Sequence, residues 1–193
     1  TFSCKEAWQG MRQILPKVAW ADIVWFLDCI PKHSFCLWLT FHNAHRTMDK
    51  LRSYGLVADN QCLFGCCGLE SIDHLFFGCE FTAGVWNLCL RKFGFRRGCR
   101  PWMEGAAWVT DKLRGRSFKG WISRVALAAV VYFCWTERNN RVFRNEYRDI
   151  TDIQNLIGLT VLSKCQGMKM FPDSLVNRDI SGNWGIPERL LVV

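Results

Sequence analysis

Val125-Ala-Leu-Ala-Ala-Val-Val-Tyr-Phe-Cys-Trp135 is the longest uninterrupted apolar run in this chain, and the architecture expected for the rest follows from it. The run has eleven residues, whereas a helix that crosses a bilayer needs roughly 20. It lies inside a longer helical pattern, from Phe118 to about Asn145, that is apolar on most of its faces. The pattern therefore predicts a long helix buried in a protein core, and no membrane partner.

Apolar residues recur at helical spacing in six further segments, which predict helices at 5–15, 18–27, 32–43, 48–54, 74–93 and 152–164. Pro31 fits the first turn of the third of these helices, since its missing N–H would have no partner there. Thr47 is a suitable N-cap for the fourth, and Gly55 and Gly94 are suitable residues to follow a helix end. Residues 59–70 lack helical spacing and predict a tight turn or short hairpin.

The segment from Cys62 to Cys79 concentrates cysteine and histidine as no other part of the chain does. Cys62 and Cys66 are separated by three residues, and His74 and Cys79 by four, which gives the pattern C-x3-C-x7-H-x4-C. Structural zinc takes four such donors in tetrahedral geometry, often two from a tight turn and two from a helix start. The spacing therefore predicts one structural Zn²⁺ held by Cys62, Cys66, His74 and Cys79.

Two alternatives to this ligand set stay open. The four residues could be buried thiols around a core histidine, with no metal ion. Cys67 also competes with Cys66, because adjacent side chains rarely point at one ion. His42 and His45 could share a helix face, but no cysteine or carboxylate at helical spacing joins the two, so at these positions and at His33 we expect satisfied or solvent-facing side chains rather than ligands.

The fold class predicted is mainly α: a small helical bundle with a Cys/His zinc-binding turn and a long C-terminal helix. The predicted division is a helical zinc-binding domain at 1–93, a basic linker at 94–117, a helical extension at 118–165 and an extended tail at 166–193. Glycine and arginine in the linker, and two prolines with several turn residues in the tail, indicate irregular structure there.

The net charge of +8 is concentrated in one part of the chain. Residues 90–148 contain 14 Lys/Arg and 4 Asp/Glu, so this stretch has a net charge of +10. A basic cluster here is interleaved with Phe93, Phe95 and Trp102, and its members are Arg91, Lys92, Arg96, Arg97 and Arg100. Arginine can pair with phosphates while aromatic rings stack on unpaired bases, which predicts contact with RNA or DNA. The alternative is a solvated linker whose aromatic side chains belong to the core.

Eleven cysteines, an odd number, occur mostly among large apolar neighbours, and no basic-then-apolar leader opens the sequence. This pattern predicts a reducing compartment, the nucleus or cytoplasm, and not a secreted protein. The chain begins at Thr1 with residues typical of a domain interior, which is expected of a fragment or a broken reading frame.

Motifs for catalysis are missing from the sequence. It has no Tyr-x-Asp-Asp motif, no clustered carboxylates for two catalytic metals, no G-x-S-x-G and no phosphate-binding loop. A zinc ion with four protein ligands also has no open position for water. The sequence therefore predicts that this chain is not an enzyme.

Several separated motifs, in order, resemble the plant reverse-transcriptase zinc-binding domain. They are Ile30–Leu39, Thr47–Leu56, Cys62–Ser71, His74–Cys79 and Val85-Trp86, with Phe2–Trp8 and Trp25-Phe26 similar to the lead-in and Trp135–Phe143 similar to the segment that follows the domain. The resemblance covers about residues 2–145. It implies a zinc-binding module downstream of the polymerase of non-LTR (LINE-type) retroelements, often ahead of a ribonuclease H domain, and hence either domain as a partner.

One position departs from that family. Its ligand pattern resembles C-x2-C-x8-H-x4-C, which puts the second ligand at Gly65. Either Cys66 substitutes through a one-residue shift of the turn, or the site has lost a ligand. The function predicted is a non-catalytic zinc-binding module that contacts nucleic acid. The alternatives are a structural or protein-interaction module and a decayed retroelement remnant without present activity.

Overall fold

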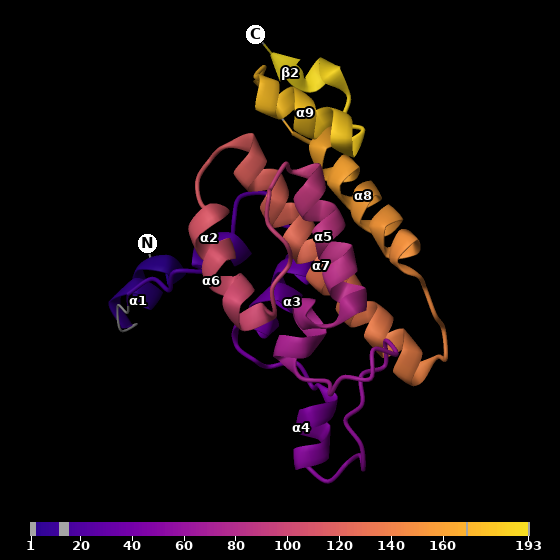
Figure 1. Cartoon of the computed structure of the whole chain (residues 1–193). Helices are drawn as coiled ribbons and strands as arrows, with labels where there is room; N and C mark the ends of the chain where they lie inside the picture. Colours follow the sequence, from indigo (N-terminus) through magenta and orange to yellow (C-terminus); the bar gives the residue numbers. More distant parts are fainter. Residues whose placement is uncertain (1–2, 12–15, 169, 193) are drawn as a thin grey trace.

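The computed structural model describes residues 3–11, 16–168 and 170–192, and it is mainly helical, as predicted (Figure 1). Its elements are α1 (Cys4–Met11), α2 (Ala21–Val24), α3 (Pro31–Phe41), α4 (Met48–Ser53), the π-helical turn η1 (His74–Gly78), α5 (Glu80–Lys92), α6 (Trp102–Lys112), α7 (Phe118–Phe143), α8 (Ile150–Gln166), β1 (Phe171–Pro172), α9 (Leu175–Trp184), the 3₁₀ turn η2 (Glu188–Leu190) and β2 (Leu191–Val192). The core lies where α3, α5 and α8 pack around α7.

Helix α7 is the central element of the bundle. Ser117 caps its first turn by accepting a hydrogen bond from the Gly120 N–H at 3.1 Å. Within the described residues it is the one helix long and apolar enough to span a membrane, but 78% of its apolar window is buried inside the protein. The buried residues form an unbroken run from Phe118 to Val131, apart from Lys119. The predicted core helix is thus confirmed.

Most of the other predicted helices also form. Helices α3, α4 and α8 lie within about two residues of their predicted bounds, and α1 ends at Met11 in the described part of the chain. The predicted extension of α1 to Leu15 lies outside the described residues, as does Phe2 of the family's lead-in. Gly55 and Gly94 adopt the left-handed conformation expected just after a helix, with φ of 71° and 70°.

Helix α2 is shorter than predicted, with four residues in place of a helix over 18–27. The chain leaves the helix at Trp25, and Asp28 takes a left-handed φ of 60°. Trp121 on α7 donates a hydrogen bond from its Nε1 to the Leu27 carbonyl at 3.2 Å. This contact with a distant segment replaces the helical bonding that the local pattern favoured.

The predicted helix over 74–93 is wrong in its first part. Phe77 has a φ of 83° and Cys79 is extended, so the chain forms η1, breaks, and begins α5 at Glu80. Thr82 stabilises the break, since its Oγ1 accepts a hydrogen bond from the Phe77 N–H at 3.2 Å and donates one to the Cys79 carbonyl at 3.2 Å. His74 and Cys79 therefore do not share one helical turn.

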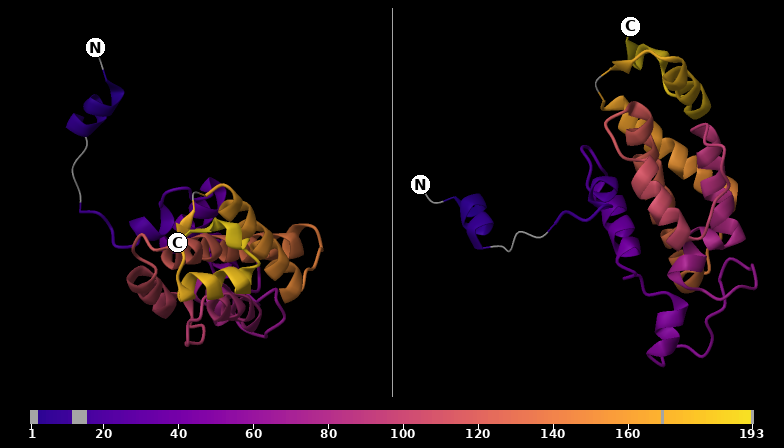
Figure 2. Two further views of the ribbon diagram at one scale, coloured as in Figure 1. Left: turned by 90° about the horizontal axis from the view of Figure 1, so that it is seen from above. Right: turned by 60° about the vertical axis from the view of Figure 1, so that its left-hand side comes forward.

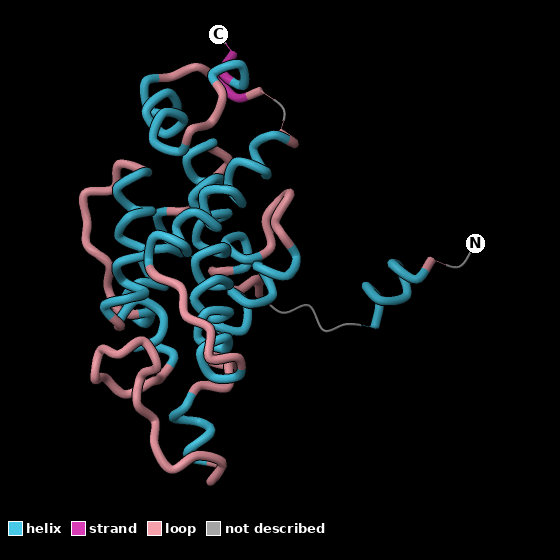
Figure 3. The backbone as a smooth tube through the Cα atoms, turned by 90° about the vertical axis from the view of Figure 1, so that its right-hand side faces the viewer, coloured by secondary structure: helices cyan, strands magenta, loops and turns pink. Residues whose placement is uncertain are grey.

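Two segments predicted as irregular contain helices. Helix α6 occupies the middle of the predicted linker, because Trp102, Val109 and Leu113 bury one face of it. The predicted extended tail contains α9, which packs against α5, α7 and α8 (Figure 2). The tail also contains β1 and β2, a two-residue parallel pair at the C-terminal end of the molecule (Figure 3). The division at residues 93, 117 and 165 stays a prediction, although one buried core runs from Ile23 to Ile186.

Candidate metal centre

Residues 61–69 form the short hairpin predicted for this region. Gln61 and Leu69 pair as an isolated antiparallel bridge, and the Cys62 N–H donates to the Gly68 carbonyl at 2.8 Å. Gly65 and Cys67 adopt left-handed conformations, with φ of 77° and 58°. These two residues reverse the chain direction within a few residues.

The four cysteine and histidine residues singled out from the sequence converge at this hairpin. The donor atoms of Cys62, Cys66, His74 and Cys79 all lie within 4.8 Å of one another. The Sγ–Sγ distances are 3.8 Å between Cys62 and Cys79 and 3.6 Å between Cys66 and Cys79, and Cys66 Sγ is 3.1 Å from His74 Nε2. Zinc–sulfur bonds of about 2.3 Å in a tetrahedron separate two sulfurs by about 3.8 Å. The two Sγ–Sγ distances therefore match the separation of sulfurs in a tetrahedral zinc site, and the four donors are close enough to share one metal ion.

Burial separates Cys66 from its neighbour Cys67. Cys62 and Cys79 are buried and Cys66 is half-buried, whereas Cys67 is exposed and lies outside the cluster. Gly65, where the family pattern has a ligand, has a left-handed φ that disfavours any residue with a Cβ. The turn geometry thus favours a donor from Cys66 rather than from position 65 or 67.

Gly68 makes room for the imidazole of His74. A Cβ atom on Gly68 would lie 2.5 Å from Cε1 and 3.0 Å from Nε2 of that ring. The Ser71 hydroxyl accepts a hydrogen bond from the His74 N–H at 3.2 Å, which begins the η1 turn. The ring therefore packs directly on the backbone of the hairpin that provides Cys62 and Cys66.

The break after η1 positions Cys79. Its extended backbone allows its N–H to reach the His74 carbonyl at 2.6 Å, while its own carbonyl accepts from Ala83 at the start of α5. A hydrogen bond from the Cys62 thiol lowers the pKa of Cys79, and the same pairing raises the pKa of Cys62. Cys79 thus ionises readily, and thiolate is the form that binds zinc.

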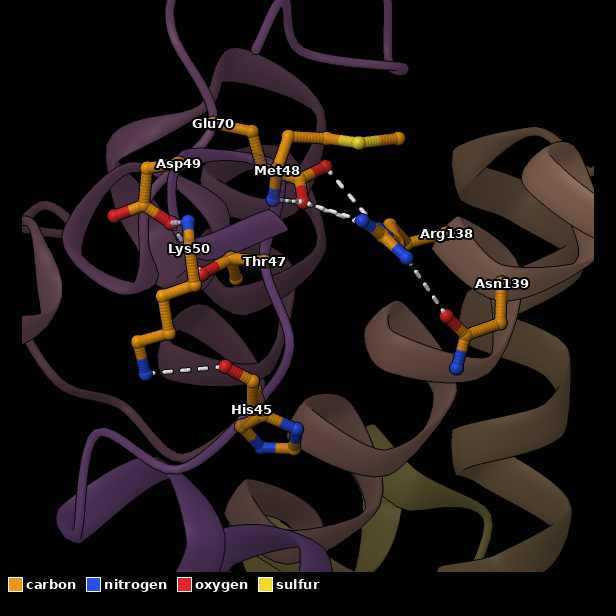
Figure 4. Close-up of polar contacts among 8 residues, drawn as sticks. All are labelled: His45, Thr47, Met48, Asp49, Lys50, Glu70, Arg138 and Asn139. Carbon is orange, nitrogen blue, oxygen red and sulfur yellow. Dashed lines mark hydrogen bonds and ion pairs between the residues drawn. The ribbon is translucent and has the colours of Figure 1, made fainter. Parts of the chain in front are cut away.

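An ion pair buried beneath the hairpin connects it to α7 (Figure 4). Arg138 Nη2 donates to Glu70 Oε1 at 2.8 Å and its Nε donates to Glu70 Oε2 at 3.2 Å. Glu70 Oε1 also accepts from the Met48 N–H at 2.9 Å, so this carboxylate caps α4. Thr47, the predicted capping residue, makes no side-chain capping bond and donates to Asp49 instead.

Arg141 holds the hairpin at a second point. Its Nη1 donates to the Leu63 carbonyl at 3.2 Å, and its guanidinium lies over the stacked rings of Phe64 and Phe81. Glu137 accepts from Arg141 Nε at 2.8 Å. The roles of these residues were not predicted. Their one sequence signal was the similarity of 135–143 to the segment that follows the family's domain.

The other histidines lie outside the donor cluster. His45 is buried, and its Nε2 lies 3.0 Å from both the Cys36 carbonyl and Thr40 Oγ1. Buried His33 stacks on Tyr132, with ring centroids 4.3 Å apart. Burial lowers the pKa of His33 and of His45 to about 4. His42 is exposed, so none of the three is placed to complete this metal site.

The predicted basic cluster occupies the end of α5 and the loop after it. Arg91, Arg96 and Arg100 are exposed. The Lys92 ammonium lies over the ring of Trp184, and the Arg97 guanidinium lies over the ring of Trp108. Phe95 is half-buried and packs edge-to-face against Trp108. Phe93 and Trp102 are buried in the core. The expectation that these two rings stack on bases is therefore wrong.

Comparison with known proteins places the donor cluster in a family context. Residues 2–86 match the family model described as zinc-binding in reverse transcriptase, and this range includes all four donors. Searches of curated proteins and of solved structures found no match to the chain. The matched segment contains the converging cysteines and histidine, so residues 2–86 of this chain are similar to the zinc-binding domain of reverse transcriptases in sequence and contain a matching set of donors.

Proposed function

We propose that Cys62, Cys66, His74 and Cys79 hold one structural Zn²⁺, and that this ion braces the hairpin against η1 and α5. The observation that carries the proposal is the convergence of four donor atoms within 4.8 Å. A zinc ion bound by all four would have no open coordination position, so it would stabilise the fold and perform no hydrolysis. A structural zinc can contribute roughly 10–16 kcal/mol to folding in small domains.

Metal analysis of the purified chain tests this assignment. We expect close to one zinc per chain in the wild type and in Cys67→Ser, and a strong loss in Cys66→Ser. Cys67→Ser is the matched control, because it removes a thiol from the same hairpin but outside the cluster. Equal zinc content in both variants, or loss only in Cys67→Ser, would exclude the proposed ligand set.

The module is also proposed to contact nucleic acid through the basic cluster, Arg91, Lys92, Arg96, Arg97 and Arg100. Arg91, Arg96 and Arg100 are exposed, and these five cations lie close together in the chain with no acidic residue among them. Since Phe93 and Trp102 are buried, the contact proposed is mainly with phosphates rather than through stacking.

Binding to single-stranded RNA across a salt series tests this contact. Each lost phosphate contact reduces the slope of log K against log salt by about 0.7 for single strands. We therefore expect Arg96→Ala/Arg100→Ala to weaken binding and flatten the slope. Arg46→Ala/Arg144→Ala, which removes two exposed arginines elsewhere, is the charge-matched control. No affinity and no salt slope for the wild type would refute the contact.

The context proposed is a non-LTR, plant-type retroelement reverse transcriptase, with this chain beside a polymerase or ribonuclease H domain and without catalytic activity of its own. The match to a family described as zinc-binding in reverse transcriptase supports this context. A reducing intracellular compartment, nucleus or cytoplasm, and no membrane association are also proposed. All eleven cysteines are free, which supports the reducing compartment.

A protein-interaction module is the second candidate function. Tyr54, Leu56 and Leu69 are exposed around α4 and the hairpin, although they are large and apolar. If the chain docks on a neighbouring polymerase domain there, Leu56→Ser/Leu69→Ser should abolish co-purification with that domain and leave zinc content unchanged. Absence of zinc, RNA binding and docking together would instead favour a decayed remnant.

A further inference from the structure

A cavity of about 1210 Å³ lies between α2, the first turns of α7 and the segment that follows α8. Its walls come from residue 17 and α2 with the segment after it, the turn between α6 and α7, the first turns of α7, and residues 167, 168 and 170–172. It shares no residue with the metal cluster or with the basic cluster. A typical small-ligand pocket has about 300–1,000 Å³, so this cavity is large enough for an extended ligand.

Arg124 lines this cavity as a buried positive charge. It is 6% exposed, its Nη1 donates to the carbonyls of Leu113 and Gly115, and its guanidinium lies over the ring of Phe26. Within the described residues Arg124 forms no ion pair, and its Nε has no hydrogen-bond partner. The charge of Asp22 reaches Arg124, but Asp22 is itself paired with Lys17, so the buried charge of Arg124 is only partly balanced. Burying an incompletely balanced charge is costly, so Arg124 favours an anionic ligand.

Positive charge also dominates the rim of the cavity. Arg114 and Arg116 are exposed on the turn before α7. Two acids line the cavity, and one of them, Asp22, is already paired with Lys17, which leaves Asp28 against three arginines. Helix α7 begins beside this rim at Phe118, and the positive end of its dipole adds to the attraction for an anion.

An exposed indole accompanies these cations. Trp25 is 48% exposed and lines the cavity in the segment that leaves α2. Arginines beside an accessible aromatic face are the combination that binds the phosphates and unpaired bases of single strands. An acidic peptide would satisfy the arginines but would leave the indole face without an aromatic partner.

We propose that this cavity binds a short segment of single-stranded nucleic acid, with phosphates at Arg124 and Arg116 and a base stacked on Trp25. The site is separate from the basic cluster and goes beyond the contact proposed there. This inference rests on the proposed function only for the class of ligand, which is nucleic acid in both cases.

Cross-linking of the whole chain to single-stranded RNA containing 4-thiouridine, followed by mass spectrometry of the peptides, locates the contact. We expect cross-links in peptides covering 16–28 and 112–124. Trp25→Ala/Arg116→Ala should weaken binding by at least about 5-fold, because stacking and a phosphate contact are both lost. Trp8→Ala/Arg46→Ala is the matched control, since it removes an exposed tryptophan and an exposed arginine elsewhere.

Cross-links confined to residues 91–100, with unchanged affinity of Trp25→Ala/Arg116→Ala, would overturn this inference and leave the contact through the basic cluster intact. Competition by poly-glutamate as effective as that by unlabelled RNA would overturn it in favour of an acidic polypeptide. No RNA binding by the wild type would overturn both nucleic-acid proposals, and the zinc content would still report on the metal site.

Discussion

Glu70 and Arg138, 68 residues apart in the sequence, form an ion pair with three hydrogen bonds, and neither side chain is more than 2% exposed (Figure 4). The carboxylate follows the metal-site hairpin directly, and the guanidinium belongs to the central helix. The pair therefore connects the candidate zinc site to the part of the bundle that contains most of the core.

Removing both partners of this pair should cost less than the two single removals added together. Arg138→Met leaves a buried carboxylate without its counter-ion, for which we expect a loss of about 3–5 kcal/mol in the free energy of unfolding. Glu70→Gln/Arg138→Met should lose less than the sum of the two single variants. Urea unfolding of the four proteins checks this, and strictly additive losses would show that the pair is not coupled.

Gly68→Ala should weaken metal binding specifically. The added Cβ would meet the His74 ring at 2.5 Å and displace a ligand, so we expect a loss of zinc affinity of at least 10-fold, of the order found when the surroundings of a metal ligand are altered. Competition with a chromogenic chelator measures the affinity. Gly98→Ala is the control, because nothing lies within 4 Å of a Cβ there. Similar affinities for the two variants would contradict the role given to Gly68.

Acidification should destabilise the fold through His33. Its pKa is lowered to about 4 in the folded state, so between pH 6.5 and 4 the unfolded chain binds more protons. The contribution of neutral His33 to the free energy of unfolding is thus fully present above pH 6.5 and is lost as the pH falls toward 4. Between pH 7 and pH 5 this amounts to about 2 kcal/mol.

His33→Phe should reduce the change in the free energy of unfolding between pH 7 and pH 5 by about 2 kcal/mol. The wild type and the variant are compared by urea unfolding at the same zinc concentration. His42→Phe, at an exposed position, should keep the wild-type pH dependence. An unchanged pH profile for His33→Phe would show that His33 is not held neutral in the fold.

Trp184 should determine whether the C-terminal segment stays docked. It is buried against Phe93, with ring centroids 5.0 Å apart, so Trp184→Ala should cost about 3–5 kcal/mol. We expect faster proteolytic cleavage beyond residue 172 in this variant. Leu175→Ala, at an exposed position of the same helix, should be cleaved at the wild-type rate. Equal rates for the two variants would mean that α9 contributes little to the fold.

Local sequence patterns were sufficient for much of the helical framework. The spacing of apolar residues predicted α7, and Pro31 and Gly94 marked helix boundaries correctly. These signals depend on residues within one or two helical turns, and hence they can be read from the chain alone. The same is true of the hairpin at 61–69, whose tight turn was expected from its glycines.

Distant contacts account for what the patterns missed. Phe77 leaves the helical conformation because Thr82 and the buried surroundings of Cys79 stabilise the break. Helix α6 and α9 form because the core accepts one face of each, although their composition suggested irregular structure. Phe93 and Trp102 are unavailable to a ligand for the same reason, since burial of an aromatic ring in the core outweighs its position in a basic stretch.

The sequence alone specified the helical class, the turn and the four candidate donors, because periodicity, glycine conformation and ligand spacing are properties of short segments. Convergence of those donors, exclusion of Cys67, the contact of Glu70 with Arg138 and the unpaired charge of Arg124 arose only when the chain packed. The physical reason is that each depends on the burial of groups from distant segments against one another, and the free energy of that burial is not encoded in any single segment.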